Sequence, residues 1–356
     1  MGFFISWIRG LAEKFDKIVV LCLNDGNYSL PANVKVYGLG KNHGAGKLKQ
    51  FFTFYLLLFT LRHNYDAVFV HMNPIWVVLG GPFWRLAGKK VFFWYTSGGV
   101  TTKLRLAEKF SNIILTASKE SFRLLSKKVI VTGHGIDTEL FKPNLTRLNL
   151  ETPSLRFNLG ILSVGRIAPV KNYETLIDAA KILKDRGPIR SSLAEVPTGL
   201  AKSNLASETS NGMDFSVTIV GEAPLEGDRN YEVGIRNKIK NLGLEDKFNF
   251  TGKVNHNDLP GYYQSHDIFI HLSKTGSLDK TILEAMACGM KVLSSNDASR
   301  SFLSQEFIFN DSNSSELAQK IITLVNTHSD EKLREYVIQN HNLGRLINKI
   351  SSIIQS

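Results

Sequence analysis

Short runs of apolar residues alternate along the first half of the chain with longer segments of helical periodicity. The runs are "KIVVLCL" (17–23), "DAVFVHM" (66–72), "KVFFWYT" (90–96), "NIILTAS" (112–118) and "KVIVTGH" (128–134). The segments between them include "LKQFFTFYLLLFTLRHN" and "TKLRLAEKF". Uninterrupted apolar runs of this length are typical of parallel strands buried on both faces, with helices as the crossover connections. The pattern therefore predicts a doubly wound α/β sheet.

A second series of the same kind occupies the other half. Its predicted strands are "NLGILSVG" (158–165), "FSVTIVG" (215–221), "KFNFTG" (247–252), "DIFIHLS" (267–273) and "MKVLSS" (290–295). Helical patterns separate them, including "NYETLIDAAKILKDRG" and "EVGIRNKIKNLG". The polar, proline-punctuated segment from 137 to 158 reads as a link. We expect two Rossmann-like domains facing across a cleft, over residues 1–145 and 155–335.

Three features depart from a simple repeat of strands and helices. Residues 188–213 are rich in Ser, Thr, Asn and Ala and stand where a connection is normally short, so they predict a surface insertion. The chain opens on an amphipathic helical pattern, "FFISWIRGLAEKF", so a first strand is expected to be missing. Neither half carries G-x-G-x-x-G after a strand, which argues against a dinucleotide-binding dehydrogenase.

The longest apolar segment, "FFTFYLLLFTL" (51–61), is shorter than a membrane span requires. We expect it to form a buried helix in preference to an interfacial one. Cys22 and Cys288 lie far apart inside apolar segments. They read as small core residues in a reducing compartment, and neither a disulfide framework nor a metal site is expected. These features predict a cytoplasmic protein.

The net charge of +11 is unevenly distributed. Residues 1–150 contain 20 Lys and Arg against 8 Asp and Glu, whereas the remainder contains 23 against 24. The excess is consistent with a solvated basic face, or with a surface that meets anionic lipid headgroups or an anionic acceptor. No nucleic-acid motif is present, and the aromatic residues sit in apolar runs, so nucleic acid is not expected as a partner.

Polar and glycine residues follow each predicted strand of the second half. Gly165, Arg166 and Lys171 follow the first strand, Gly221 and Glu222 the second, and Lys253 the third. In open parallel sheets, ligands bind beyond the carboxyl ends of the strands. The two cations on one loop suit a diphosphate, because two fixed donors can hold both phosphoryl groups. A solvent-facing loop with chance basic residues is the alternative.

The stretch "TGSLDKTILEAMACGMKVL" (275–293) predicts a loop, a helix and a strand. Its helix start is an anion site in which Gly276 allows close backbone approach and Lys280 and Thr281 add donors. Glu284 stands about one turn further on, where a carboxylate can accept bonds from both hydroxyls of a ribose. The plainer interpretation is that Glu284 only complements the helix dipole, worth about 0.3–1 kcal/mol.

At this point the residues resemble a known family. "SVGRIAPVKNYETLIDAAKIL", "VTIVGEAP", "FNFTGKV" and "SKTGSLDKTILEAMACGMKVL" are similar to the donor domain of retaining glycosyltransferases of family 4, which have the GT-B fold. "TGHGIDTELFKP" resembles the end of that family's first domain, and residues 336–356 resemble its last helix, which crosses back to the first domain. The likeness covers most of residues 66–350.

The resemblance implies a hexose transferred from a nucleotide-diphosphate sugar to a glycan or lipid-linked acceptor, with no cofactor and no required metal. Carried over by position, Arg166 and Lys171 hold the diphosphate and stabilise the leaving charge, and Glu284 binds the ribose. The backbone near Gly221 and Lys253 frames the base. The basic first half would make a peripheral contact with the inner face of an anionic membrane.

Two positions differ from the family pattern. Gly276 stands where the family has a glutamate that contacts the donor sugar, and Ser97 stands where it has a histidine near the reacting sugar. Ser97 is therefore the candidate at that catalytic position. These differences, with the short N-terminus, leave open a nucleotide-binding protein of the same fold that does not catalyse transfer. A nucleotide-sugar epimerase is a third interpretation.

Overall fold

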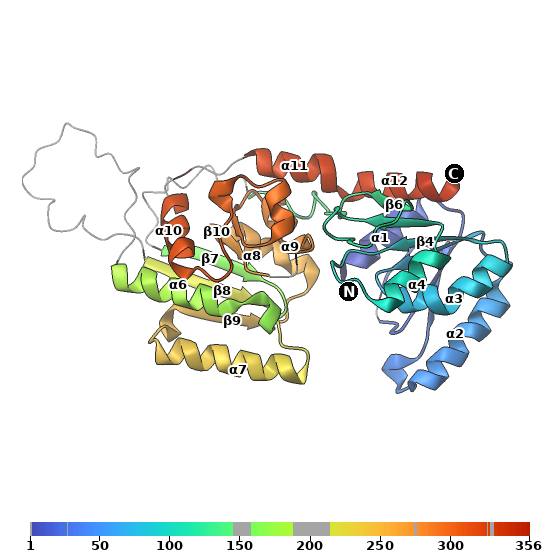
Figure 1. Cartoon of the computed structure of the whole chain (residues 1–356), viewed down its shortest axis with the longest axis horizontal. Helices are drawn as coiled ribbons and strands as arrows, with labels where there is room; N and C mark the ends of the chain where they lie inside the picture. Colours follow the sequence, from blue (N-terminus) through green and yellow to red (C-terminus); the bar gives the residue numbers. More distant parts are fainter. Residues whose placement is uncertain are drawn as a thin grey trace, which may run out of the picture. The chain divides into compact units, whose positions relative to one another are not determined.

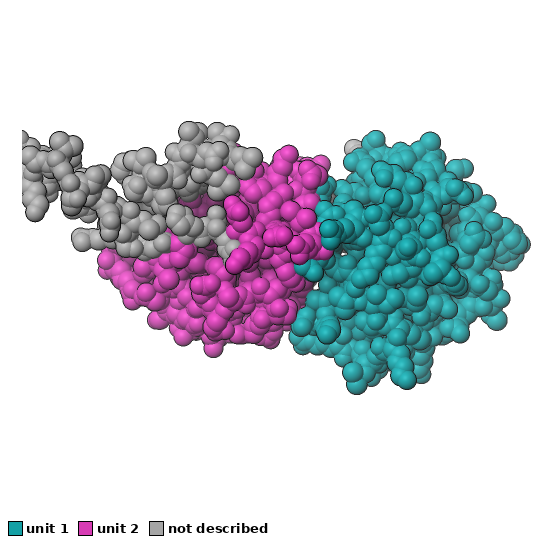
Figure 2. Space-filling model, turned by 90° about the horizontal axis from the view of Figure 1, so that it is seen from above, with its two compact units in different colours: residues 1–137, 340–356 teal, residues 138–339 magenta. Residues whose placement is uncertain are grey.

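A computed structural model describes residues 2–26, 28–144, 158–187, 214–273, 276–325, 327 and 331–356. The chain divides into two compact units (Figure 2). Unit 1 comprises residues 1–137 and 340–356, and unit 2 comprises residues 138–339. The predicted insertion at 188–213 and most of the predicted link, 145–157, lie outside the described residues.

Four of the predicted strands form the main sheet of unit 1. They are parallel and lie side by side in the order β3 (Ala67–His71), β4 (Lys90–Trp94), β5 (Ile113–Thr116) and β6 (Val129–Val131). A second, two-stranded sheet pairs β1 (Ile18–Cys22) with β2 (Val34–Gly38). Sequence analysis missed β2, because its five residues include the exposed Lys35 and show no uninterrupted apolar run.

Helices cover both faces of the β3–β6 sheet (Figure 1). On one face, α1 (Gly2–Ala12) and α12 (Leu343–Gln355) pack with the sheet through a cluster that includes Trp7, Trp94 and Ile347. On the other, α2 (Lys47–Leu61), α3 (Pro74–Leu86) and α4 (Thr102–Phe110) share a cluster with Phe93. Phe93 and Trp94 are neighbours in β4 and enter opposite cores, as the two-residue period of a strand requires.

The helix α2 differs from the sequence-based expectation. Phe54 and Leu58 are buried, but Leu48, Phe52, Leu56 and Phe59 are between 58% and 70% exposed. The prediction of a buried helix is therefore wrong for about half of its circumference. A helix that is apolar on every side gives no periodic signal for the side that meets the core. None of the described helices is both long and apolar enough to cross a membrane.

Unit 2 contains a five-stranded parallel sheet. Its order is β11 (Lys291–Ser294), β10 (Ile268–His271), β7 (Asn158–Val164), β8 (Asp214–Val220) and β9 (Phe248–Gly252). The chain runs outward from β7 through β8 to β9 and then returns to the other side of β7. The neighbours β7 and β10 therefore flank the topological switch point, where ligands bind in sheets of this kind.

The helices of unit 2 are α6 (Tyr173–Arg186), α7 (Glu226–Asn241), α8 (Leu259–Ser265), α9 (Lys280–Ala287), α10 (Ser314–Val325) and most of α11 (Glu331–His341). The helix α6 packs against α7 and α10, whereas α9 contacts β10 and β11. The α9 contacts depend on small residues, because Ala285 and Ala287 are fully buried and let the helix lie close to the sheet.

A buried histidine lies where the chain returns to unit 1. His341 ends α11, and its Nδ1 accepts a hydrogen bond of 3.1 Å from the backbone N–H of His134. The backbone N–H of Ile136 donates to the carbonyl of His341 at 2.6 Å. Burial lowers the pKa of His341 from 6.5 to about 4, because the charged imidazolium loses its hydration.

This shift predicts that stability falls in mild acid. Between about pH 6.5 and pH 4, His341 is protonated in the unfolded chain and neutral in the folded one, so proton uptake favours unfolding. The loss should reach about 3 kcal/mol at the lower end of this window. Urea unfolding of His341→Asn, which keeps an acceptor for the His134 N–H, should show a flatter pH dependence than the parent. An equal slope in both proteins would contradict the assignment to His341.

Candidate functional site

The switch point of unit 2 holds a close ion pair. Lys171 ends the short 3-10 helix Pro169–Lys171 that follows β7, and Asp279 precedes α9 on the connection from β10. The Lys171 Nζ lies 2.6 Å from the Asp279 Oδ2, and the lysine side chain is only 14% exposed. The pair therefore joins two loops that are 108 residues apart in the sequence.

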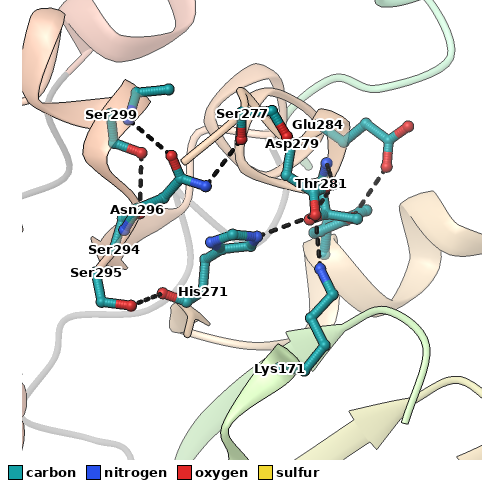
Figure 3. A network of polar contacts seen from close by, with 12 residues as sticks. Lys171, His271, Ser277, Asp279, Thr281, Glu284, Ser294, Ser295, Asn296 and Ser299 are labelled. Carbon is teal, nitrogen blue, oxygen red and sulfur yellow. Dashed lines mark hydrogen bonds and ion pairs between the residues drawn. The ribbon is translucent and has the colours of Figure 1, made fainter. Parts of the chain in front are cut away.

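Asp279 also caps helix α9. Its Oδ1 accepts hydrogen bonds from the backbone N–H and from the hydroxyl of Thr281, both at 3.3 Å, and its Oδ2 accepts one from the His271 Nε2 at 3.1 Å (Figure 3). Burial alone would raise the pKa of Asp279. The charge of Lys171 and the hydrogen bond from His271 outweigh burial and hold this pKa well below its usual value. The carboxylate is thus ionised and occupies the anion site of the helix start.

His271 supplies a hydrogen bond to this network without a charge. It is the last residue of β10 and is 1% exposed. Burial, followed by the nearby Lys171 ammonium, lowers its pKa and keeps the ring neutral, although Asp279 acts in the opposite direction. In the neutral ring Nε2 carries the proton that it donates to Asp279. The Nδ1 is then an acceptor, and among the described residues it has no hydrogen-bond partner.

The loop before Asp279 is fixed by a buried asparagine. The side-chain amide of Asn296 donates to the Ser277 carbonyl at 2.9 Å, and its carbonyl oxygen accepts from the Ala298 N–H at 2.8 Å (Figure 3). Gly276 has φ +64°, a left-handed conformation that favours glycine. A glutamate at this position would be strained in this backbone conformation.

Glu284 lies one turn into α9 and is 3% exposed. Its Oε1 contacts the His256 Nε2 at 3.0 Å, its Oε2 accepts a bond of 3.1 Å from the Tyr263 hydroxyl, and the Lys280 Nζ lies 3.8 Å away. Burial raises the pKa of Glu284, but the His256 hydrogen bond and the Lys280 charge outweigh it and lower the pKa overall. The carboxylate therefore remains ionised inside the protein.

The ends of β7, β8 and β9 converge through their backbones. The Gly165 N–H donates to the Val220 carbonyl at 2.9 Å, and the Gly221 N–H donates to the Gly252 carbonyl at 3.0 Å. A Cβ at Gly221 would lie 1.8 Å from the Gly165 carbonyl oxygen, so any larger residue would force the strand ends apart. Gly221 is therefore needed for this close approach, whereas a Cβ at Gly165 would lie 3.0 Å from the Lys171 Cε.

The remaining predicted residues of unit 2 point to other partners. The Arg166 Nε lies 3.7 Å from the Asp228 Oδ2 on α7, with about half of the arginine side chain exposed. Lys253 and Glu222 form a 3.7 Å pair, and both side chains are exposed. The structure brings Lys171, Lys280, Thr281 and Glu284 together around the start of α9, whereas Arg166 pairs with α7.

Ser97 lies in unit 1, on the segment after β4, and is partly buried. Sequence analysis did not identify Asp279, His271, His256 or Tyr263 as members of the site. One signal was available for Asp279, since aspartate directly before a helix is a preferred N-cap. The other three lie on loops or elements whose proximity to α9 only the folded chain establishes.

Parts of the chain are similar to known proteins. The family model described as "Glycosyl transferases group 1" matches residues 158–342, more than half of the chain. Mannosylfructose-phosphate synthase of Agrobacterium fabrum is 32% identical over 175 residues, which are 48% of this chain and 33% of that protein. D-inositol 3-phosphate glycosyltransferase of an Arthrobacter species is 26% identical over 200 residues, 54% of this chain and 41% of that protein. The matched region is thus less than half of each of these relatives.

Similarity to solved structures covers both units of the chain. Anabaena HepE, solved in complex with UDP and glucose, superposes with a TM-score of 0.71 at 19% identity, covering 99% of this chain and 95% of that one. The likeness confirms the predicted α/β fold with two Rossmann-like units, the GT-B fold. Together with the family match over the switch-point unit, it leads to one conclusion: the chain belongs to the glycosyl transferases group 1 family.

Proposed function

We propose that the chain is a retaining, metal-independent hexosyltransferase of family 4, which binds a nucleotide-diphosphate sugar at the carboxyl edge of the unit 2 sheet. The observation that carries this proposal is the convergence of four separate strand ends there. Lys171 and the start of α9 supply a cation and backbone donors for the diphosphate. Gly165 and Gly221 have no side chains, so a ligand can approach their backbone closely beside Lys171 and the start of α9.

We assign the following roles to the side chains. Lys171 and Arg166, with Lys280 and Thr281, bind and stabilise the diphosphate leaving group. Glu284 binds the ribose: a carboxylate can accept about four hydrogen bonds, so it can add the two vicinal hydroxyls to its bonds from His256 and Tyr263. We assign Glu222 and Lys253 to the side of the base, and the Gly276 backbone to the contact with the sugar that a side chain would otherwise make.

For the acceptor we propose a glycan or a lipid-linked molecule bound by unit 1, with Ser97 near the reacting sugar. The support is electrostatic, since the excess basic charge of the protein lies in residues 1–150. Such a field attracts anionic acceptors and anionic lipid surfaces. The neighbouring Anabaena structure, which holds UDP and glucose, supports the choice of a nucleotide sugar as donor. We propose a cytoplasmic location at the inner face of the membrane.

Ribose recognition by Glu284 gives a direct binding prediction. By calorimetry, UDP should bind about tenfold more tightly than 2′-deoxy-UDP, because loss of one hydroxyl leaves a buried acceptor without its partner. Glu284→Gln should weaken UDP binding and reduce this discrimination, whereas Glu232→Gln on α7, where the carboxylate pairs with Arg236, should leave both unchanged. Unchanged discrimination in a folded Glu284→Gln variant would remove Glu284 from the ribose site.

The reaction itself is tested by incubating the full chain with UDP-, GDP- and ADP-hexoses and with sugar or lipid-linked acceptors, followed by NMR of the products. Transfer with the anomeric configuration kept supports the proposal. Binding of a nucleotide sugar without transfer to any acceptor would instead indicate a nucleotide-binding protein. Conversion of the donor sugar without an acceptor would indicate an epimerase, and no binding of any nucleotide would overturn the proposed site.

A further inference from the structure

The exposed side of α2 carries an apolar stripe. Leu48, Phe52, Leu56 and Phe59 follow one another at intervals of four, four and three residues, which places them on one face of a helix. They are 70%, 63%, 63% and 58% exposed. Single exposed apolar side chains are ordinary, but a continuous stripe along a whole helix marks an interaction surface. We call these four residues the α2 stripe.

The rest of unit 1 holds this stripe in place. On the opposite side of the helix, Phe54 and Leu58 belong to the unit 1 core, and the Phe54 ring lies 4.9 Å from the Trp76 ring on α3. The Tyr55 hydroxyl donates to the Leu79 carbonyl at 2.8 Å. Figure 1 shows α2 beside α3 at the margin of the unit. Because one side is anchored, α2 cannot rotate to bury its stripe.

The chain segment that carries the stripe is basic. Residues 41–65 contain Lys41, Lys47, Lys49 and Arg62 and no aspartate or glutamate. The three lysines are exposed, and two of them stand in the first turn of α2. At the other end, the Arg62 guanidinium lies 4.2 Å above the Phe59 ring. Apolar side chains flanked by cations at both ends match the two layers of an anionic membrane surface, acyl chains beneath phosphates.

We propose that α2 docks unit 1 on an anionic lipid bilayer, with the stripe at the headgroup–acyl boundary and the lysines and Arg62 on the lipid phosphates. A helix of 15 residues is too short to span the bilayer and lies along its surface. A second copy of the chain is the less suitable occupant. A symmetric pair would set two acid-free basic segments against each other, and like charges at an interface are unfavourable.

This inference rests on the membrane contact of unit 1 proposed above and assigns it to one helix. It can fail separately from the donor chemistry, because it concerns a surface of unit 1 and needs no nucleotide. The test is co-sedimentation of the full chain with vesicles of phosphatidylcholine alone or with added phosphatidylglycerol. The parent protein should bind the anionic vesicles, and raised salt should weaken binding. The triple variant Phe52→Ser, Leu56→Ser, Phe59→Ser should lose about tenfold or more in partitioning. Lys47→Gln with Lys49→Gln should reduce the preference for the anionic lipid.

The matched control substitutes three exposed apolar residues outside α2, Leu106→Ser, Leu125→Ser and Val233→Ser, and should bind as the parent does. An unchanged melting temperature and an unchanged tryptophan fluorescence spectrum, which reports on unit 1, show that each variant is folded. Equal vesicle binding by the stripe variant, or no binding by the parent, overturns the proposal. A parent dimer that the stripe variant dissociates in sedimentation velocity would assign the surface to a second copy and likewise overturn it.

Discussion

Replacing Lys171 with methionine should destabilise unit 2 by about 2–3 kcal/mol, below the larger cost of a fully enclosed pair because the Asp279 side chain retains 27% exposure. The substitution leaves an ionised carboxylate without its counter-charge. Adding Asp279→Asn should restore most of the lost stability, since the double variant removes both charges. The same single variant should bind UDP much more weakly, because it lacks the enclosed cation of the proposed diphosphate site.

The chain offers an internal reference for this measurement. All four tryptophans, Trp7, Trp76, Trp84 and Trp94, lie in unit 1. Tryptophan fluorescence in urea therefore follows unit 1, and hydrogen exchange at β7 and β10 follows unit 2. We expect faster exchange in unit 2 with little change in the fluorescence transition. A double variant as unstable as Lys171→Met would show that Lys171 stabilises the fold by its packing and not by the ion pair.

Replacing Asp279 alone with asparagine should tighten UDP binding by about tenfold or more. In the parent protein the Asp279 carboxylate contacts Lys171, the Thr281 N–H and hydroxyl, and His271. These are the donors that a diphosphate would use. The repulsion between a carboxylate and one phosphate charge about 5 Å away is about 3 kcal/mol at an effective dielectric constant of about 20, and about 1 kcal/mol in bulk water. Asparagine keeps an acceptor for the helix cap and removes this repulsion.

Calorimetry with UDP at several salt concentrations measures the effect. Asp178→Asn removes a carboxylate that pairs with Lys238 away from the switch point, and it should leave the affinity unchanged. Lys171→Met added to Asp279→Asn should abolish the gain, because the released cation is then absent. Weaker binding by Asp279→Asn would reverse our interpretation and make Asp279 the residue that positions Lys171 for the diphosphate.

Much of the fold follows from patterns that the linear chain already contains. The five apolar runs of the second half became β7–β11, because strands buried on both faces must be apolar throughout. The placement of glycines, cations and donors directly after those runs located the candidate site, because parallel strands end at one edge. The β2 strand was missed, since a short strand with an exposed lysine resembles a loop.

The side-chain contacts within the site were harder to predict from the sequence. The sequence paired Arg166 with Lys171 because they share a loop, yet Arg166 contacts Asp228 while Lys171 contacts Asp279. Which carboxylate a lysine meets depends on strand order, and the neighbours β7 and β10 are more than 100 residues apart in the chain. Local patterns carry no information about that order. Likewise, nothing in the amino-acid sequence of α2 distinguishes Phe54, which is buried, from Phe52, which is exposed.

The amino-acid sequence by itself determined every described strand except β2 and the residues gathered at the ends of the strands, because these depend on hydrophobic periodicity and backbone preference over a few neighbours. Only the tertiary structure decided that Asp279 occupies the anion site of α9, that Glu284 is enclosed by His256 and Tyr263, and that α2 presents an apolar stripe to solvent. Ion pairing and burial act between groups brought together by the sheet, so they are properties of strand order and packing.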